Sequence, residues 1–448
     1  MRRLLIRVLF LLLLCCLYSP RNSQATKISK LFTTQESRVA AAEIPRSPQL
    51  DSLEKELKAG NRAALENFWQ QVAGKGTPLV EPSKGDARNV MVTFLWRSKD
   101  EAHVVLMSEF GDNVRSRLLT RLLDTDIWYT TYRMRNDARF LYQFSVNDPD
   151  FPFEGNAETR FPANSQPDPL NPHRWGTMHS LVELPAAPPL TWSARQPDVP
   201  KGVVGQIKPD FKSSILNNER RIFIYKPPGF TADGPPYPLV VVGTTYMSTI
   251  PLPVMLDNLQ AKGLVSAAVV LFVDYPQGAK DRELSCDPKY GDFLAKELVP
   301  SMRERLHATS DPRQTIIGGA SISGLSAACV AFQHPEVFGN VLSQSGSFWW
   351  SPPTDVEDQW LIRQFASSPK LPIRFYLSIG LLESGHAFRD GLISMLHANR
   401  HLRDVLQARG YTVEYREVNG GHDPYNWQAT LPDGLITLIG KKNQKSNE

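Results

Sequence analysis

Cysteine is scarce in this chain, with four residues among 448. Cys15 and Cys16 lie in an apolar N-terminal segment, which leaves only Cys286 and Cys329 for the rest of the protein. One disulfide at most is therefore available there, and it would stabilise the fold by about 2–4 kcal/mol. Because the sequence gives no distance between the two thiols, two separate thiols are the simpler expectation and pairing stays open.

An excess of charge of one sign is also missing. The chain holds 50 basic and 46 acidic side chains, and the four arginines among the first 25 residues account for the whole difference. The remaining sequence is neutral, without the electrostatic footprint that nucleic acid or an anionic membrane surface requires. We expect neither of these as a partner.

The N-terminus carries an apolar run, 8–17, that is too short to span a bilayer comfortably. It follows the basic start Met1-Arg2-Arg3 and precedes Ser23-Gln24-Ala25, whose small residues suit a cleavage site. This pattern predicts a secretory signal peptide over 1–25, followed by a linker over 26–52. An uncleaved membrane anchor is the alternative, and with cleavage no stable membrane association is expected.

The length predicts about two domains. Residues 53–72 place apolar side chains at helical spacing, and short strand-like runs follow at 91–96, 103–106, 126–129 and 140–144. This spacing predicts a small β-sandwich of immunoglobulin type over 53–165. Residues 149–215 are crowded with Pro, Asn, Asp and Gly, which predicts a long connection, with 166–215 between the domains.

From Arg220 onward, apolar strands alternate with helices, and no internal repeat is visible. The predicted strands are 221–225, 239–242, 267–273, 314–317, 341–342, 374–379 and 412–415, and the predicted helices are 292–306, 325–332 and 393–408. Such alternation predicts a largely parallel sheet covered by helices on both faces. The fold class is therefore α/β, with the second domain over 216–442.

One serine lies on a predicted strand–turn–helix junction, in the segment 318–324 (GGASISG). This junction exposes the Ser321 hydroxyl beside the N-terminal amides of a helix, as an acyl-transfer nucleophile requires. The motif G-x-S-x-G is met except that Ser323 replaces the second glycine. A tight turn before a buried helix would produce the same pattern, so the motif alone is a weak signal.

A base and an orienting acid should follow such a serine in the order Ser, acid, His. His422 follows two glycines on a loop after the last strand, where it can take the serine proton and return it. Glu383 lies just past the preceding strand and is the first choice for the acid, with Asp390 second. Asp423 is too close in sequence to orient its neighbour's ring.

The oxyanion of an acyl-transfer intermediate needs backbone donors, for which we predict the N–H groups of Ile322 and Thr244. Candidate substrate contacts surround the same sheet edge: Tyr246, Lys280, Arg282, Trp349 and Trp350. Packing by the aromatic residues and solvation of the two cations are the alternatives. His397 and His401 stand four residues apart on a helix, but no third ligand accompanies them, so a solvated helix face is expected there in place of zinc.

Several motifs in order resemble the enterochelin (enterobactin) esterase family, whose members hydrolyse the ester bonds of catecholate siderophore trilactones. The resemblance covers roughly 68–440 and rests on GTPLVEP at 76–82, VTFLWR at 92–97, TDIW at 125–128, DPLNP at 168–172, ELSC at 283–286, SQSGSFWW at 343–350 and GGHD at 420–423. It implies an immunoglobulin-like domain followed by an α/β-hydrolase domain, with Ser321, His422 and Glu383 as nucleophile, base and acid.

The resemblance implies a serine esterase that opens ferric catecholate siderophores and so aids iron release. No cofactor is expected, because iron enters with the substrate. With the export signal, the expected location is the periplasm of a Gram-negative bacterium. Ser323 and Val242 depart from the family pattern, which keeps open a binding protein with a compromised site. A general esterase acting on acylated sugars or hydroxycinnamates is the other alternative.

Overall fold

The computed structural model describes residues 45–108, 117–151, 164–385 and 393–441. The predicted signal peptide and most of the predicted linker lie outside these ranges. Across the described ranges, no helix has the length and apolar character needed to cross a membrane.

Two helices open the described chain where the sequence predicts one over 53–72. Helix α3 (Pro48–Lys58) begins earlier than expected, because the Ser47 hydroxyl caps it by accepting from the Leu50 N–H. Helix α4 (Ala63–Lys75) is separated from it at Gly60, whose φ of 90° suits glycine. The prediction of one helix is wrong. The apolar residues keep helical spacing on both sides of Gly60, but the chain leaves the helical conformation at this glycine.

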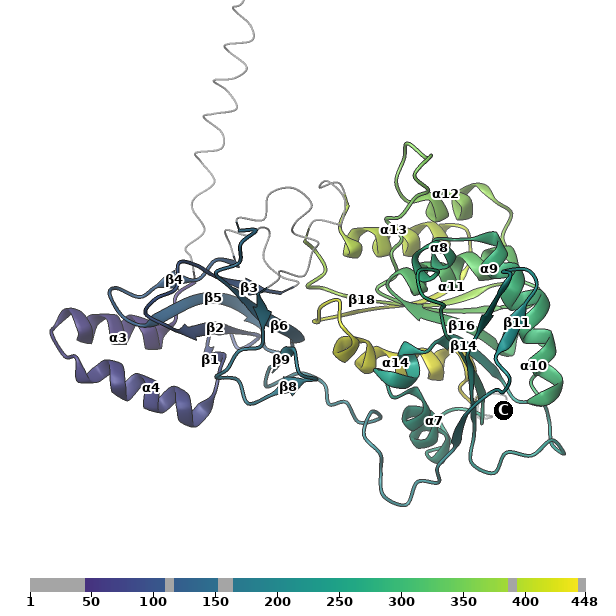
Figure 1. Ribbon diagram of the computed structural model, residues 1–448, viewed down its shortest axis with the longest axis horizontal. Helices are drawn as coiled ribbons and strands as arrows, with labels where there is room; N and C mark the ends of the chain where they lie inside the picture. Colours follow the sequence, from purple (N-terminus) through teal and green to yellow (C-terminus); the bar gives the residue numbers. More distant parts are fainter. Residues whose placement is uncertain (1–44, 109–116, 152–163, 386–392, 442–448) are drawn as a thin grey trace, which may run out of the picture. The chain divides into compact units, whose positions relative to one another are not determined.

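The predicted β-sandwich is confirmed as two antiparallel sheets (Figure 1). The first sheet contains β1 (Leu79–Pro82), β2 (Asn89–Arg97), β5 (Ile127–Arg135) and β4 (Thr120–Arg121); the second contains β3 (Val104–Met107), β6 (Arg139–Val146), β9 (His179–Glu183) and β8 (Arg174–Trp175), with β7 (Ser165–Gln166) beside β6. Alternate residues of β2 and β6, such as Phe94 and Phe140, form the core between the sheets. Leu95, on the opposite face of β2, packs with Phe68 and Trp69 of α4.

The sandwich extends beyond its predicted end at 165. Strands β8 and β9 pair with each other and with β6, so the region expected as a connection contributes to the second sheet. The fully buried Asp168 organises this region by accepting hydrogen bonds from Thr77 Oγ1 (2.6 Å) and the Tyr142 hydroxyl (2.7 Å). Strands of two residues show no periodicity, which is why the sequence did not predict them.

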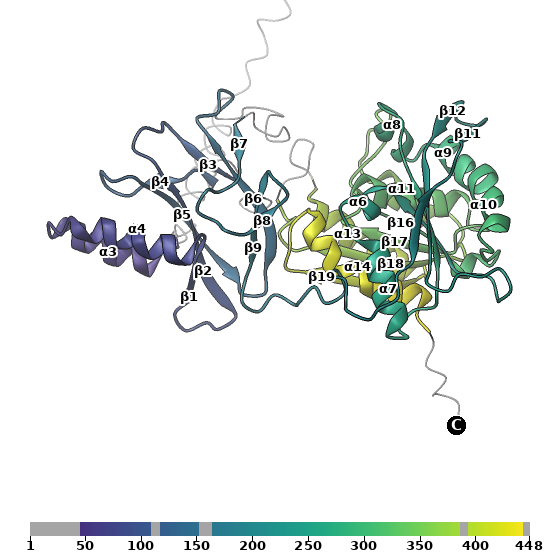
Figure 2. The same cartoon turned by 60° about the horizontal axis from the view of Figure 1, so that its bottom comes forward.

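The second domain contains an eight-stranded sheet that is parallel from β15 through β19 (Figures 1 and 2). Its order is β10 (Val203–Gln206), β13 (Ile222–Lys226), β15 (Val269–Val273), β14 (Leu239–Gly243), β16 (Thr315–Ala320), β17 (Asn340–Gln344), β18 (Arg374–Gly380) and β19 (Thr412–Val418). Strands β10 and β13 are antiparallel to their neighbours, and β11 (Phe211–Ser213) pairs with β12 (Asn218–Arg220) as a separate hairpin. The predicted α/β class is confirmed.

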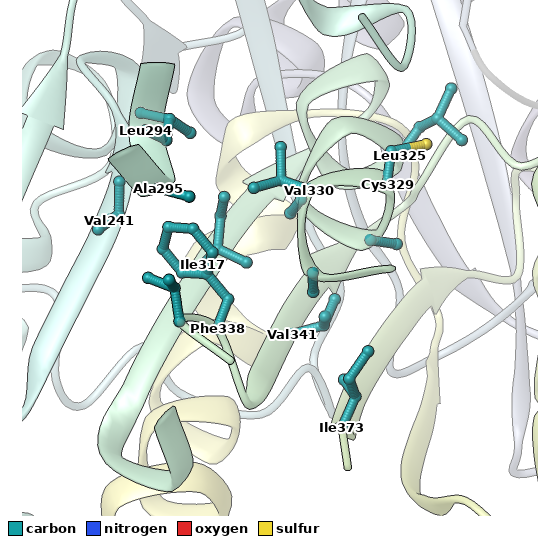
Figure 3. Packing of buried hydrophobic residues seen from close by; sticks show 14 of the residues in the cluster. Val241, Leu294, Ala295, Ile317, Leu325, Cys329, Val330, Phe338, Val341 and Ile373 are labelled. Carbon is teal, nitrogen blue, oxygen red and sulfur yellow. The ribbon is translucent and has the colours of Figure 1, made fainter. Parts of the chain in front are cut away.

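Helices cover both faces of this sheet (Figure 2). One face carries α9 (Pro288–Asp292), the π-helical segment Phe293–Leu298, α10 (Val299–Arg305), α11 (Ile322–Gln333), α12 (Trp360–Ser367) and α13 (Met395–Ala408); the other carries α6 (Thr245–Ser248), α7 (Leu252–Ala261) and α14 (Pro424–Ile439). In Figure 3, Ile317 and Val341 from neighbouring strands lie on the side of α11 that carries Val330. This packing fixes the helix that follows Ser321.

Cys286 and Cys329 form a disulfide, with a Cα–Cα distance of 5.4 Å. The expectation of two separate thiols is therefore wrong. The bridge ties α11 to the segment just after α8 (Lys280–Leu284), and α8 itself packs against α11. A fully buried bidentate ion pair between Arg220 and Glu283 anchors α8 from the other side, with N–O distances of 3.0 and 2.9 Å.

Candidate active site

Ser321 occupies a sharp turn between β16 and α11, as its sequence context predicts. Its backbone has φ 58° and ψ −127°, a conformation that a residue with a side chain rarely adopts. The turn is held to the end of β17, because the Ser321 N–H donates to Gln344 O (2.9 Å) and the Ser321 carbonyl accepts from the Ser347 N–H (3.1 Å). Such a strained turn at the end of a central strand is typical of a nucleophile elbow.

The close approach of α11 to β16 requires glycine at 319 but not at 323. A Cβ on Gly319 would lie 2.4 Å from the backbone carbonyl carbon of Ser323, nearer than any real contact. Ser323 itself has the helical backbone of the first turn of α11, and its side chain lines the same small cavity as Tyr275. The departure from G-x-S-x-G is therefore accommodated without strain.

The structure brings together the predicted base and acid. His422 Nδ1 lies 2.7 Å from Glu383 Oε2, and the Glu383 side chain is 1% exposed. Since an ionised carboxylate can only accept, Nδ1 carries the proton, which leaves Nε2 as the basic nitrogen. The expected pairing is confirmed, while the catalytic roles of the two residues stay predictions.

The other acids considered do not replace Glu383. Asp423 caps α14 by accepting from the Asn426 N–H (2.8 Å), and it also accepts from the Leu141 N–H (3.4 Å). Burial raises the pKa of Asp423 to about 6. Asp423 therefore serves the fold of the loop that carries His422, and Asp390 lies outside the described residues.

The two predicted oxyanion donors differ in the structure. The Ile322 N–H belongs to the first residue of α11, where no carbonyl of the helix's own preceding turn is available to accept it. The Thr244 N–H, in contrast, donates to Val273 O (3.3 Å), so it is not the unoccupied donor that the sequence predicts. Strand β14 pairs with β15 as far as Gly243, one residue beyond the predicted end of the strand, and the hydrogen bond of the next amide continues this pairing. The next amide, that of Thr245, opens helix α6 and replaces it as the candidate.

The predicted substrate contacts fall into two groups, one residue that packs in the core and four that do not. Tyr246 is 2% exposed and donates its hydroxyl to Gln344 Oε1 (2.8 Å), so it packs in the core and the prediction that it contacts substrate is not supported. Lys280 and Arg282 are exposed on α8, and Trp349 and Trp350 are half-buried beyond the segment that contacts the Ser321 turn. These four residues stay predictions.

Two residues beside the triad were not predicted as functional. Ser345 Oγ lies 2.6 Å from Glu383 Oε1, and Trp427 Nε1 lies 2.9 Å from Ser345 Oγ. Ser345 falls within the motif SQSGSFWW, which was a signal for the resemblance but gave no role to this serine. Trp427 follows the GGHD motif by four residues and carries no sequence signal of its own.

Comparisons with known proteins cover both domains. Residues 213–438 match the family model described as "Putative esterase", and residues 91–193 match "Enterochelin esterase, N-terminal". The iron(III) enterobactin esterase of Dickeya dadantii (strain 3937) is 30% identical over 429 residues, covering 86% of this chain and 95% of that protein. The iron(III) salmochelin esterase of Escherichia coli O6:H1 is 27% identical, over 87% of this chain and 97% of that protein.

Solved structures give the same result. The ferric enterobactin esterase from Salmonella typhimurium has a TM-score of 0.66 at 26% identity, covering 83% of this chain and 98% of that chain. The enterobactin esterase from Shigella flexneri, solved in the presence of enterobactin, has a TM-score of 0.64 at 25% identity, covering 83% of this chain and 97% of that chain. With an esterase model matching residues 213–438 and likeness to these proteins in both domains, the chain belongs to the enterochelin esterase family and is a carboxylic ester hydrolase.

Proposed function

We propose that this chain is an exported serine esterase that hydrolyses the ester bonds of a catecholate siderophore trilactone. The observation that carries the proposal is the pairing of His422 with the buried Glu383, in the same domain as the strained Ser321 turn. The likeness to enterobactin and salmochelin esterases, which extends over both domains, supports the substrate class.

In this reaction Ser321 Oγ attacks the ester carbonyl while His422 Nε2 takes its proton. The carbonyl oxygen becomes an oxyanion, which accepts from the Ile322 N–H and from the candidate donor at Thr245. Collapse of the intermediate breaks the ester C–O bond, and His422 returns the proton to the leaving alkoxide. Water then attacks the acyl-enzyme by the same route and releases the acid.

Opening the trilactone would weaken iron binding, because the ring preorganises three catecholates around one metal ion. Iron is cargo in this account and arrives with the substrate. We assign Lys280 and Arg282 to the anionic ferric complex and the half-buried Trp349 and Trp350 to its aromatic rings. The packing of α8 against α11, the helix that follows Ser321, supports the first of these assignments.

A panel of esters tests the proposed substrate class. The purified protein is given a catecholate trilactone with and without iron, a feruloyl sugar and an acetylated sugar, and kcat/KM is measured for each. We expect the trilactone to exceed both sugars by at least about 100-fold. A preference for either sugar would replace the siderophore with a general ester substrate, and failure on the whole panel would support a binding protein.

Export to the periplasm is a separate part of the proposal. It rests on the signal-like segment 1–25, and the Cys286–Cys329 disulfide supports it, because such bonds persist in oxidising compartments. Fractionation of a Gram-negative host that expresses the full chain tests it. The protein should appear in the periplasmic fraction, and deletion of residues 2–25 should retain it in the cytoplasm. Full-length protein in the cytoplasmic fraction would contradict export, and full-length protein in the membrane fraction would mean that the N-terminal segment stays as an uncleaved anchor.

A further inference from the structure

Glu383 has two carboxylate oxygens, and only one of them contacts His422. The other, Oε1, lies 2.8 Å from the Gly380 N–H and 2.6 Å from Ser345 Oγ. A buried carboxylate held by donors at both oxygens has its plane fixed, and His422 is aligned with it. The serine hydroxyl therefore contributes to the geometry of the pair although it is remote from the reacting ester.

Trp427 determines the direction in which the Ser345 hydroxyl points. Its Nε1–H can only donate, and it donates to Ser345 Oγ at 2.9 Å. The serine proton is then directed to the remaining acceptor, Glu383 Oε1. The same indole packs edge to face against the His422 ring, with centroids 5.2 Å apart and an interplanar angle of 86°. Trp427 thus contacts the base directly and the acid through one hydroxyl.

Both residues are themselves held firmly. Ser345 is 1% exposed, has φ 48°, and donates its N–H to Ser378 O (2.7 Å), which fixes it between the ends of β17 and β18. Trp427 is 8% exposed in the first turn of α14, and its carbonyl accepts from Gln344 Nε2 (2.7 Å). These contacts fix the backbone positions from which the hydroxyl and the indole project.

We infer that Ser345 and Trp427 are positioning residues for catalysis, forming a hydrogen-bonded chain Trp427–Ser345–Glu383–His422 that aligns the base. The inference rests on the proposed hydrolytic function. It concerns the alignment of Glu383 and His422, so it predicts a loss in kcat with little change in KM. It also predicts that the Ser345 hydroxyl acts through Glu383 alone.

The test compares Ser345→Ala, Trp427→Phe and Glu383→Gln, singly and with Ser345→Ala added to Glu383→Gln. Ser345→Ala should lower kcat about 10- to 100-fold, with KM within about twofold of the wild type. Trp427→Phe keeps the ring but removes the N–H and should lower kcat about 3- to 10-fold. In the Glu383→Gln background, Ser345→Ala should cause no further loss.

Ser343→Ala is the matched control, because it removes a buried serine hydroxyl two residues before Ser345, near the end of β17. Ser343 Oγ has no hydrogen-bond partner among the described residues, so kcat should be unchanged. Thermal unfolding of each variant separates misfolding from misalignment, and Trp427→Phe carries the test if Ser345→Ala fails to fold. A folded Ser345→Ala with kcat within twofold of the wild type, or a loss that adds to that of Glu383→Gln, would overturn the inference.

The readouts separate this inference from the substrate proposal. All variants are assayed on p-nitrophenyl butyrate and by the rate at which a fluorophosphonate labels Ser321, besides the trilactone. A wild type that cleaves the simple ester but not the trilactone would refute the siderophore substrate and leave the positioning test intact. A wild type that neither cleaves nor labels would overturn both.

Discussion

Ser321 occupies a backbone conformation that costs roughly 1–3 kcal/mol for a residue with a side chain. The contacts at this turn offset that cost: its N–H is bound by the last residue of β17, its carbonyl is bound by the segment that follows β17, and Gly319 lets α11 approach the strand. The sequence predicted the turn because glycine surrounds the serine. It did not reveal how Ser323 fits, since that depends on how the first turn of α11 packs beside Tyr275, a residue distant in the sequence.

Replacing Ser323 by glycine tests whether this residue shapes the oxyanion site. Because Ser323 is helical, Ser323→Gly should leave kcat within about twofold of the wild type and reduce the free energy of unfolding by about 0.5–1 kcal/mol. Steady-state hydrolysis and urea unfolding measure the two effects. A tenfold change in kcat would mean that the side chain reshapes the site. Gly319→Ala is the contrasting variant and should prevent correct folding, as its Cβ would clash with the Ser323 backbone.

Asp423 makes stability depend on pH. Because burial raises its pKa from 3.8 to about 6, the folded state binds the proton more tightly than the unfolded state. The resulting stabilisation is complete below about pH 4 and is lost as pH rises through 6, by about 1 kcal/mol between pH 5 and pH 8. Asp423→Asn keeps a good helix cap, and its free energy of unfolding should lose this dependence on pH. Unfolding by urea at both pH values measures it, and identical pH dependence in the two proteins would contradict the assignment.

At the scale of elements, the disulfide joins α11 to the segment just after α8, the helix that carries Lys280 and Arg282. Replacing both Cys286 and Cys329 by alanine should lower the free energy of unfolding by about 2–4 kcal/mol. Since α8 carries Lys280 and Arg282, KM for the trilactone should rise while kcat changes little. Thermal unfolding and steady-state kinetics measure these effects. Treatment of the wild type with dithiothreitol should reproduce them, and the double variant should not respond to the reductant; a wild type indifferent to reduction would contradict this role.

The long apolar strands of the second domain could be predicted from the sequence, because β14 to β18 are buried on both faces and read as continuous apolar runs. Only part of its helices was predicted: α7, α12 and α14 were not. The short strands β8 and β9 could not, since two to five residues rich in polar side chains carry no period. Likewise, apolar spacing predicted helix over 53–72 but not the break at Gly60.

The candidate site likewise contains residues that could be predicted from the sequence and residues that could not. Ser321, Glu383 and His422 could be predicted because each follows a recognisable strand, in an order that the chemistry requires. The supporting contacts could not be predicted, because Ser345 meets Glu383 and Trp427 only through tertiary packing. The expectation that the Thr244 N–H is an unoccupied donor was wrong for a related reason. Whether a backbone N–H already has a hydrogen-bond acceptor depends on how far two strands stay paired, which the sequence does not show.

At the scale of the whole molecule, the sandwich contacts the loop that carries His422. The Arg139 N–H donates to Asn419 O (3.0 Å), and the Tyr425 hydroxyl donates to Glu183 Oε2 (3.1 Å), so hydrogen bonds from β6 and β9 lie on either side of His422 in sequence. The N-terminal domain therefore supports the geometry of the candidate base as well as its own fold.

The central claim is that this molecule hydrolyses a siderophore ester through Ser321. The most direct measurement follows a ferric catecholate trilactone by chromatography and mass spectrometry with the wild type and with Ser321→Ala, both shown to be folded by circular dichroism. The account predicts ring-opened products from the wild type and a rate at least about 1,000-fold lower from the variant. Comparable turnover by the folded Ser321→Ala protein would contradict it.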